Sequence, residues 1–249
     1  MNSTLHLFTS IDSTHEYLKR LTSQVSYDHT IRLCLADMQT KGRGQWDRAW
    51  HSPAGKNIYL SCLYPIKKEC NALNGLSLLV SLAVLKTLKH YATSFFVKWP
   101  NDILYVSQDK KPRKISGILV ELIARPQITL ALISIGLNVN MKTMIHEEMF
   151  DWTSLALIRE EMTDRYEIGA LLVHHLMAYL NKFEREGFSF FKCEYEESHY
   201  LKNREIILKH SNRYVSGVVS GVNDQGFLLL KKADQTIEVF LSGEASVVK

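Results

Sequence analysis

The sequence predicts an α+β protein with a large N-terminal domain, residues 1–203, and a small all-β domain, residues 204–249. Apolar segments separated by polar residues form a hairpin pattern over residues 95–123. Residues 73–88 and 165–187 carry apolar side chains every three or four positions, which is typical of helices packed on a core. After residue 204 only short strand-like segments follow, which suggests a small barrel that docks on the main domain.

The composition is that of a soluble globular protein. The 249 residues are 46% hydrophobic and 22% charged, enough to bury a core. The net charge of +4 is small, and no basic stripe with interleaved aromatics points to nucleic acid. The four cysteines are scattered, no apolar run approaches the ~18 residues of a membrane span, and the polar start lacks a signal-peptide pattern. We therefore expect a cytoplasmic protein without a membrane partner.

The N-terminal segment predicts a short strand followed by a helix. Leu5 and Leu7 begin the strand, and Ser13 with Glu16 three residues later has the spacing of a capping box. Capping alone accounts for a hydroxyl at Ser13. The apolar stripe of the helix consists of Tyr17, Leu18 and Leu21.

A predicted strand at 31–38 leads into a glycine-containing loop, Q-T-K-G-R-G-Q-W-D-R. Gly42 and Gly44 bracket Arg43, so backbone N–H groups can closely approach anionic oxygens and the guanidinium can bind phosphate or carboxylate. Such a motif is by itself most often a flexible surface turn. We expect residues 40–48 to be mobile without ligand and to become ordered over a bound ligand.

The most informative segment is the hairpin. The strand at 95–97 ends in K-W-P-N-D, where Pro100 keeps the polar cluster on an extended bend. The chain returns over 115–123, so that Asp102 and Lys114 start opposite arms and their charges can face one site. On an arbitrary hairpin this pair is a solvated ion pair of little energetic value.

The remaining elements follow from periodicity and length. Residues 57–64 predict a strand, and residues 128–139 predict a strand buried on both faces that ends in G-L-N-V-N. Helices are predicted at 154–162, 165–187 and 188–200. The terminal strands are predicted at 206–209, 214–222, 227–231, 237–241 and 246–248.

K-W-P-N-D, Lys114 and S-G-I-L together resemble the signature of the biotin protein ligases, which join biotin to a lysine of a carboxylase subunit. The resemblance extends to Q-T-K-G-R-G and to W-x-S-P-x-G-x-N-I-Y-L-S at residues 50–61, and reaches from Asp12 to Glu244. It implies a mixed, mainly antiparallel sheet with helices on one face, as in class II aminoacyl-tRNA synthetases, plus an SH3-like C-terminal barrel. The few residues before Ile11 leave no room for the DNA-binding domain of some relatives, so we expect the short form.

The resemblance also implies the reaction and its participants. ATP and biotin are the substrates, Mg²⁺ arrives with the nucleotide, and no side-chain metal site is expected. The implied partner is a biotin carboxyl carrier protein, with a homodimer as a further expectation. In this family the enzyme adenylates biotin and then transfers it to the acceptor lysine.

The family's site residues carry over to positions of this sequence. Lys114 and Arg43 are predicted to stabilise charge at the α-phosphate, and Asp102 to orient Lys114 or the incoming amine. The implied biotin-binding residues are Ser13, Thr14, Gln39, Gly42, Arg43, Lys114, Gly117, Leu119 and Gly136. The implied nucleotide-binding residues are Arg43, Gln45, Trp50, Asn101, Lys114 and Asn138.

This sequence departs from many relatives at His15, where they carry Asn, and at Gln45, where they carry Arg. Trp46 and Trp99 are predicted to be packing residues.

Two alternative functions remain open. A lipoate or octanoate ligase would use the same scaffold, but its signature of two arginines followed by glycines is absent. A non-catalytic biotin-binding module built around the terminal barrel would bind without turning over ATP. It would not use Lys114, Asn101 and Asp102 together.

Overall fold

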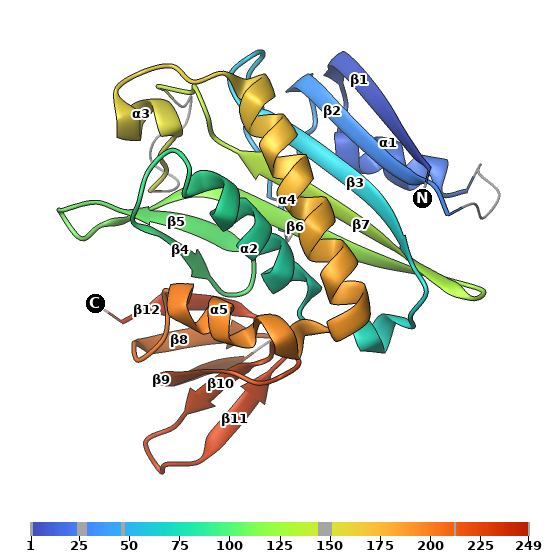
Figure 1. The fold of residues 1–249 in the computed structure, drawn as a ribbon. Coiled ribbons are helices and arrows are strands. Elements are labelled where there is room, and N and C mark those ends of the chain that lie inside the picture. Colours follow the sequence, from blue (N-terminus) through green and yellow to red (C-terminus); the bar gives the residue numbers. More distant parts are fainter. Residues whose placement is uncertain (1, 24–28, 46–47, 144–150, 212, 249) are drawn as a thin grey trace.

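The computed structural model describes residues 2–23, 29–45, 48–143, 151–211 and 213–248, which form two β-sheets (Figure 1). The large sheet has seven strands in the order β1-β2-β3-β7-β6-β5-β4. Its strands are β1 (Ser3–Ile11), β2 (Ile31–Gln39), β3 (Ile58–Ile66), β4 (Phe95–Lys98), β5 (Asp102–Val106), β6 (Pro112–Arg125) and β7 (Ile128–Leu137). β1 and β2 are parallel, and all other neighbours are antiparallel. The predicted mixed, mainly antiparallel sheet is therefore confirmed.

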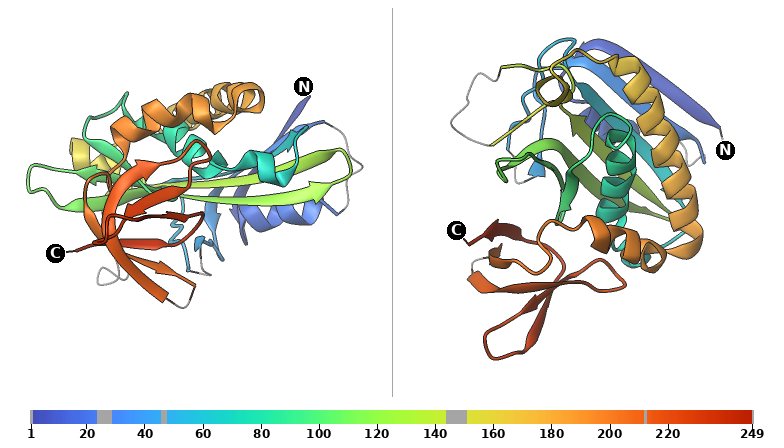
Figure 2. Two further views of the ribbon diagram at one scale, coloured as in Figure 1. Left: turned by 90° about the horizontal axis from the view of Figure 1, so that it is seen from below. Right: turned by 60° about the vertical axis from the view of Figure 1, so that its left-hand side comes forward.

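The helices cover the two faces of this sheet unequally. They are α1 (Thr14–Leu21), η2 (Cys70–Leu73), α2 (Leu76–Leu88), α3 (Leu155–Arg159), α4 (Arg165–Glu186), η4 (Phe188–Phe191) and α5 (Lys192–Ser198). The long helices α2 and α4 lie together on one face, as predicted (Figure 1). The short helix α1 lies on the opposite face (Figure 2), where Leu18 packs against Cys34 and Leu63.

The most apolar helical segment belongs to the core. Cys70–Leu88 is long and apolar enough, by length and composition, to cross a membrane. In this fold it comprises η2 and α2. The side chains of α2 are almost all buried, including Leu79, Val80 and Leu82. Packing between the sheet and α4 therefore accounts for the apolar composition of this segment.

The C-terminal part forms a five-stranded antiparallel sheet, as expected for an SH3-like barrel. Its strands are β8 (Glu205–His210), β9 (Arg213–Val222), β10 (Leu228–Lys231), β11 (Ile237–Phe240) and β12 (Glu244–Val247). The indole N–H of Trp99 donates to the carbonyl of Gly226 at 3.2 Å. Trp99 is buried as a packing residue, as predicted, whereas Trp46 lies outside the described residues. One hydrophobic core runs through both parts, so the domain boundary at residue 203 stays a prediction.

Candidate active site

Two neighbouring cavities lie against the large sheet, and the small one is lined by its central strands β3, β7 and β6. The small one has a volume of about 50 Å³ and lies between the start of α1, the glycine loop, β6 and β7. The larger one has a volume of about 410 Å³ and lies between the β4–β5 bend, the glycine loop and β12. Most of the predicted site residues line the small cavity: Ser13, Thr14, Gln39, Arg43, Gln45, Trp50, Asn101, Lys114, Gly117, Leu119 and Gly136. Asp102 and Asn138 line the larger cavity instead.

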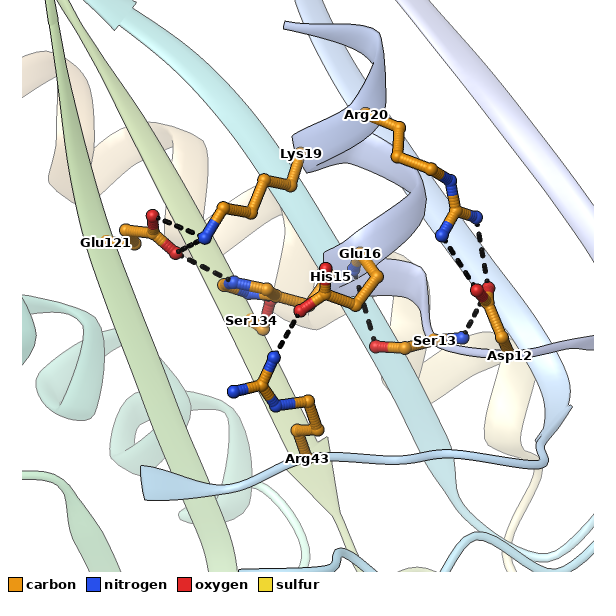
Figure 3. Close-up of polar contacts among 9 residues, drawn as sticks. All are labelled: Asp12, Ser13, His15, Glu16, Lys19, Arg20, Arg43, Glu121 and Ser134. Atoms are coloured by element: carbon orange, nitrogen blue, oxygen red, sulfur yellow. Dashed lines mark hydrogen bonds and ion pairs between the residues drawn. The ribbon is translucent and has the colours of Figure 1, made fainter. Parts of the chain in front are cut away.

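The start of α1 is fixed by its cap, as the sequence spacing predicts. The Ser13 hydroxyl accepts a hydrogen bond from the backbone N–H of Glu16 at 3.4 Å (Figure 3). The Ser13 backbone N–H donates to Asp12, which also pairs with Arg20 at 2.7 Å. The Arg20 guanidinium lowers the pKa of the Asp12 carboxyl. Ser13 and Thr14 are thereby held, buried, at one end of the small cavity.

A chain of hydroxyl groups runs beneath the small cavity. Thr14 Oγ1 lies 2.8 Å from Ser61 Oγ, and Ser61 Oγ lies 2.7 Å from Ser134 Oγ. The two serines are direct cross-strand partners on β3 and β7. At the other end, Gln39 Oε1 accepts the backbone N–H of Thr14 at 2.9 Å. The cavity therefore presents neutral donors and acceptors, which suit a polar, uncharged ring.

A buried histidine terminates this chain. His15 Nδ1 lies 2.9 Å from Ser134 Oγ, and His15 Nε2 lies 3.2 Å from Glu121 Oε2 (Figure 3). Lys19 Nζ pairs with the same carboxylate at 2.8 Å. Burial lowers the pKa of His15, although Glu121 opposes that shift. His15 therefore favours its neutral form in the ligand-free protein.

Two facing glycines make a flat floor for an indole ring. Gly117 on β6 and Gly136 on β7 are cross-strand partners. A Cβ atom at Gly136 would lie 2.4 Å from the ring of Trp50, and one at Gly117 would lie 2.9 Å from it. The indole N–H is buried without a hydrogen-bond partner in the described part of the chain. Trp50 lines both cavities.

Lys114 lines both cavities as well. Its Nζ lies 2.6 Å from Asp102 Oδ1 and 5.4 Å from the centre of the Trp50 ring. The predicted meeting of this ammonium and carboxylate is thus present in the structure. The returning arm begins earlier than the predicted residue 115, because β6 already starts at Pro112, so Lys114 lies inside the strand. Backbone hydrogen bonds to Asp151 and Thr153 hold Lys114 within the strand.

Further charged side chains line the larger cavity. Arg48 pairs with Glu244 at 2.7 Å, which links the glycine loop to β12 across the cavity. Lys98 lines the same space. Burial lowers the pKa of Lys98, and the Asp102 carboxylate opposes that shift. Several cations thus surround a space large enough for a phosphate-bearing ligand.

The two predicted asparagines make structural hydrogen bonds in this structure. Asn101 Nδ2 donates to the carbonyl of Ile118 at 2.6 Å, which ties the β4–β5 bend to β6. Asn138 Nδ2 donates to the carbonyl of Thr153 at 3.0 Å. Both side chains border cavities, and their contacts with a nucleotide stay predictions.

The glycine loop is held close to α1. Arg43 pairs with Glu16 in the first turn of α1 at 2.7 Å (Figure 3). Gly42 does not line either cavity, but a Cβ atom there would lie 2.6 Å from the carbonyl oxygen of Trp50, so a larger residue has no room. The predicted mobility of residues 40–48 falls partly on 46–47, which lie outside the described residues, and stays a prediction.

Sequence reasoning missed several side chains of the site. Ser61 interrupts an apolar run in β3 and Ser134 interrupts one in β7, and these interruptions were an available signal. Lys98 opens the K-W-P-N-D motif but received no predicted role, and Arg48 carries no such signal, because single cations in loops are common. Within the described ranges, no cluster of three or more His, Cys, Asp or Glu side chains is arranged to hold a metal ion.

The site and fold match a known family. Residues 7–140 match the family model described as the biotin/lipoate A/B protein ligase family, and residues 203–248 match the biotin protein ligase C-terminal domain. The chain therefore belongs to the biotin/lipoate A/B protein ligase family.

Named relatives agree with this assignment. The Escherichia coli bifunctional ligase/repressor BirA is 36% identical over 95% of this chain and 72% of its own length. A biotin–[acetyl-CoA-carboxylase] ligase of Mycobacterium tuberculosis is 29% identical over 90% of this chain and 81% of its own. The structure of Aquifex aeolicus biotin protein ligase in complex with biotin and ATP is 31% identical, covers 99% of both chains and superposes with a TM-score of 0.82. The predicted α+β catalytic fold with its C-terminal domain is thus confirmed.

Proposed function

We propose that this protein is an ATP-dependent biotin protein ligase that forms biotinyl-5′-adenylate and transfers biotin to a lysine of a carrier protein. One observation carries the proposal: Lys114 and Trp50 line both a small cavity that has neutral hydrogen-bonding groups at its α1 end and a larger cavity rich in cations. A ligand ring in the first and a nucleotide in the second would place a carboxylate and a phosphate beside the same ammonium group. A relative named biotin–[acetyl-CoA-carboxylase] ligase and the similar structure of a biotin protein ligase with biotin and ATP support the assignment.

The small cavity suits the chemistry of the biotin ring system. A cyclic urea carries one carbonyl acceptor and two N–H donors, and Ser13, Thr14 and Gln39 offer hydroxyl and amide partners. The space of about 50 Å³ is far below the roughly 300 Å³ at the lower end of ligand pockets. We therefore expect the Trp50 indole to leave the glycine floor when biotin binds.

In the first half-reaction a carboxylate oxygen of biotin attacks the α-phosphorus of ATP. The bond from that phosphorus to the bridging oxygen breaks, and pyrophosphate leaves with Mg²⁺. Two anionic groups must approach each other, so fixed cations are the main requirement of the site. Lys114 is the candidate for the developing charge, and Arg43 is the second candidate once it leaves Glu16.

In the second half-reaction the acceptor amine attacks the acyl carbon of the adenylate. The amine loses a proton, the bond between acyl carbon and phosphate oxygen breaks, and AMP leaves. The Asp102 carboxylate, 2.6 Å from Lys114 Nζ, is the group placed to hold either this lysine or the incoming ammonium.

The acceptor and the location of the protein belong to the same proposal. A carboxyl carrier protein as acceptor is supported by the name of the Mycobacterium tuberculosis relative. A cytoplasmic location is supported by the free thiols of Cys34, Cys62, Cys70 and Cys193. The homodimer and the absence of a nucleic-acid partner stay predictions.

Transfer to a carrier domain tests the proposed function. The purified chain, biotin and Mg-ATP are incubated with an apo biotin carboxyl carrier domain, and the mass of that domain is measured. We expect one added biotinyl group, and none on a matched carrier domain whose acceptor lysine is replaced by arginine. An unmodified carrier domain with ATP turnover intact would limit the function to adenylate formation.

A further inference from the structure

The hydroxyl chain beneath the small cavity makes four contacts in series. They join Gln39 Oε1 to Thr14 Oγ1 at 3.1 Å, Thr14 to Ser61 at 2.8 Å, Ser61 to Ser134 at 2.7 Å, and Ser134 to His15 Nδ1 at 2.9 Å. Each contact needs one proton to be a hydrogen bond. The three hydroxyl groups supply one proton each, and Gln39 Oε1 supplies none. Whether the fourth contact has a proton therefore depends on His15.

The neighbouring carboxylate decides which nitrogen of His15 carries a proton. Glu121 Oε2 lies 3.2 Å from Nε2, and an ionised carboxylate only accepts hydrogen bonds. Neutral His15 therefore carries its proton on Nε2 and presents Nδ1 as an acceptor. Burial keeps this neutral form favoured, because it lowers the pKa of His15.

With neutral His15, three protons serve four contacts. The contact left without a proton is the longest one, between Thr14 and Gln39, because Gln39 Oε1 already accepts the Thr14 backbone N–H at 2.9 Å. Thr14 then donates to Ser61, Ser61 to Ser134, and Ser134 to His15. In this arrangement Thr14 Oγ1 receives no proton, so it is an open acceptor at the wall of the cavity.

Protonation of His15 reverses the chain. Nδ1–H then donates to Ser134, Ser134 donates to Ser61, and Ser61 donates to Thr14. All four contacts are filled when Thr14 donates to Gln39. Thr14 Oγ1 now already receives a proton and is a poorer acceptor for a ligand N–H.

We propose that His15 is a positioning residue whose charge state decides whether Thr14 presents an open acceptor to a urea N–H of biotin. This inference rests on the proposed function, because it concerns how the same site holds its ring. With neutral His15 the ligand N–H donates to Thr14 Oγ1, which receives no proton from the chain of hydroxyl groups. Biotin therefore binds the neutral form more tightly, and its affinity falls as His15 is protonated.

Charged groups on three segments act on His15 (Figure 3). Glu121 on β6 and Glu16 on α1 favour the imidazolium, whereas Lys19 on α1 disfavours it. Arg43 of the glycine loop pairs with Glu16 at 2.7 Å and weakens its effect. Since burial outweighs these groups, the transition lies on the acid side of the usual histidine pKa of 6.5.

Calorimetric titration over about pH 5 to about pH 8 tests the inference. Biotin methyl ester is the ligand, because its masked carboxylate cannot titrate. We expect the affinity to fall by about threefold to tenfold toward the acid end, which is the scale of one hydrogen bond. His15→Asn, which has no titrating ring, should give a flat profile. His174→Asn, an exposed histidine on α4 across the sheet, should keep the wild-type profile.

The outcomes separate this inference from the proposed function. A flat wild-type profile with intact binding, or a pH dependence that persists in His15→Asn, overturns the inference and leaves the function standing. Absence of binding at every pH overturns both. If His15→Asn does not fold, NMR titration of the wild-type imidazole replaces it. Ligand should then shift the titration of His15 to lower pH, and an unchanged titration overturns the inference.

Discussion

At the scale of single residues, Lys114 is the side chain on which the proposed chemistry depends most. Lys114→Ala should lower the rate of adenylate formation by about 10² to 10³, the scale of removing one preorganised donor. The Lys114 side chain is 31% exposed, so the free energy of unfolding should change little in this variant. The rate is measured as pyrophosphate release in a single turnover. Lys110→Ala, at the exposed turn before β6, is the matched control and should keep the wild-type rate. A rate of adenylate formation close to wild type in Lys114→Ala would show that this lysine does not stabilise the reaction.

The sequence predicts individual site residues well where motif and geometry coincide. Ser13 caps α1 as its spacing with Glu16 indicates, and Asp102 meets Lys114 as the hairpin indicates. The contacts of His15 with Ser134 and Glu121 were not predictable, because they join α1 to β6 and β7 across more than a hundred positions. No local pattern encodes such a tertiary contact.

At the scale of elements, the floor made by β6 and β7 leads to a second prediction. Gly136→Ala adds a methyl group where the Trp50 ring lies only 2.4 Å from the built Cβ position. Because biotin is expected to replace the Trp50 ring on this floor, the added methyl group would clash with bound ligand. We expect biotin affinity to fall about tenfold to a hundredfold, because overpacking costs about 1–3 kcal/mol. The affinity is measured by calorimetry.

Gly169→Ala on α4 is the matched control for this change. The nearest atom to its added Cβ is a Leu35 methyl at 4.0 Å, so the methyl group has room. Alanine in a helix interior should stabilise the fold by about 0.5–1 kcal/mol and leave biotin affinity unchanged. Equal affinities for both variants would show that the glycine floor does not contact ligand.

The placement of elements was predictable only in part. Periodicity located the long helices, β3 was expected as a strand, and β7 was expected as a strand buried on both faces. That α1 covers the opposite face of the sheet was not predictable. Both faces of β2 bury apolar residues, Ile31 on one side and Cys34 on the other. An alternating pattern therefore does not say which helix covers which face.

At the scale of the whole molecule, His199 directly follows α5 and pairs with Val97 of the large sheet, shortly before the chain enters the C-terminal sheet. The backbone N–H of Tyr200 donates to Val97 of β4 at 2.9 Å. Both ring nitrogens of His199 are buried without a hydrogen-bond partner in the described part of the chain. Burial lowers the pKa of His199 from 6.5 to about 4.

This pKa predicts how stability depends on pH. Because the unfolded chain binds a proton at His199 below pH 6.5 and the folded protein does not until about pH 4, acidification favours unfolding. The free energy of unfolding should fall by up to about 3 kcal/mol across that window. Urea unfolding at several pH values measures it. His199→Phe should remove this part of the slope, and a variant with the wild-type slope would exclude His199 as its cause.

The central claim, that this chain adenylates biotin specifically, is tested most directly by exchange of labelled pyrophosphate into ATP. We predict exchange with biotin and Mg²⁺, and essentially none with lipoate or octanoate. A lipoyl or octanoyl chain would leave the buried groups of Thr14 and Gln39 unpaired. Sites built to hydrogen-bond a substrate reject analogues that lack those groups by about 10⁴ or more. Exchange driven by lipoate, or none with any of the three acids, would contradict the claim.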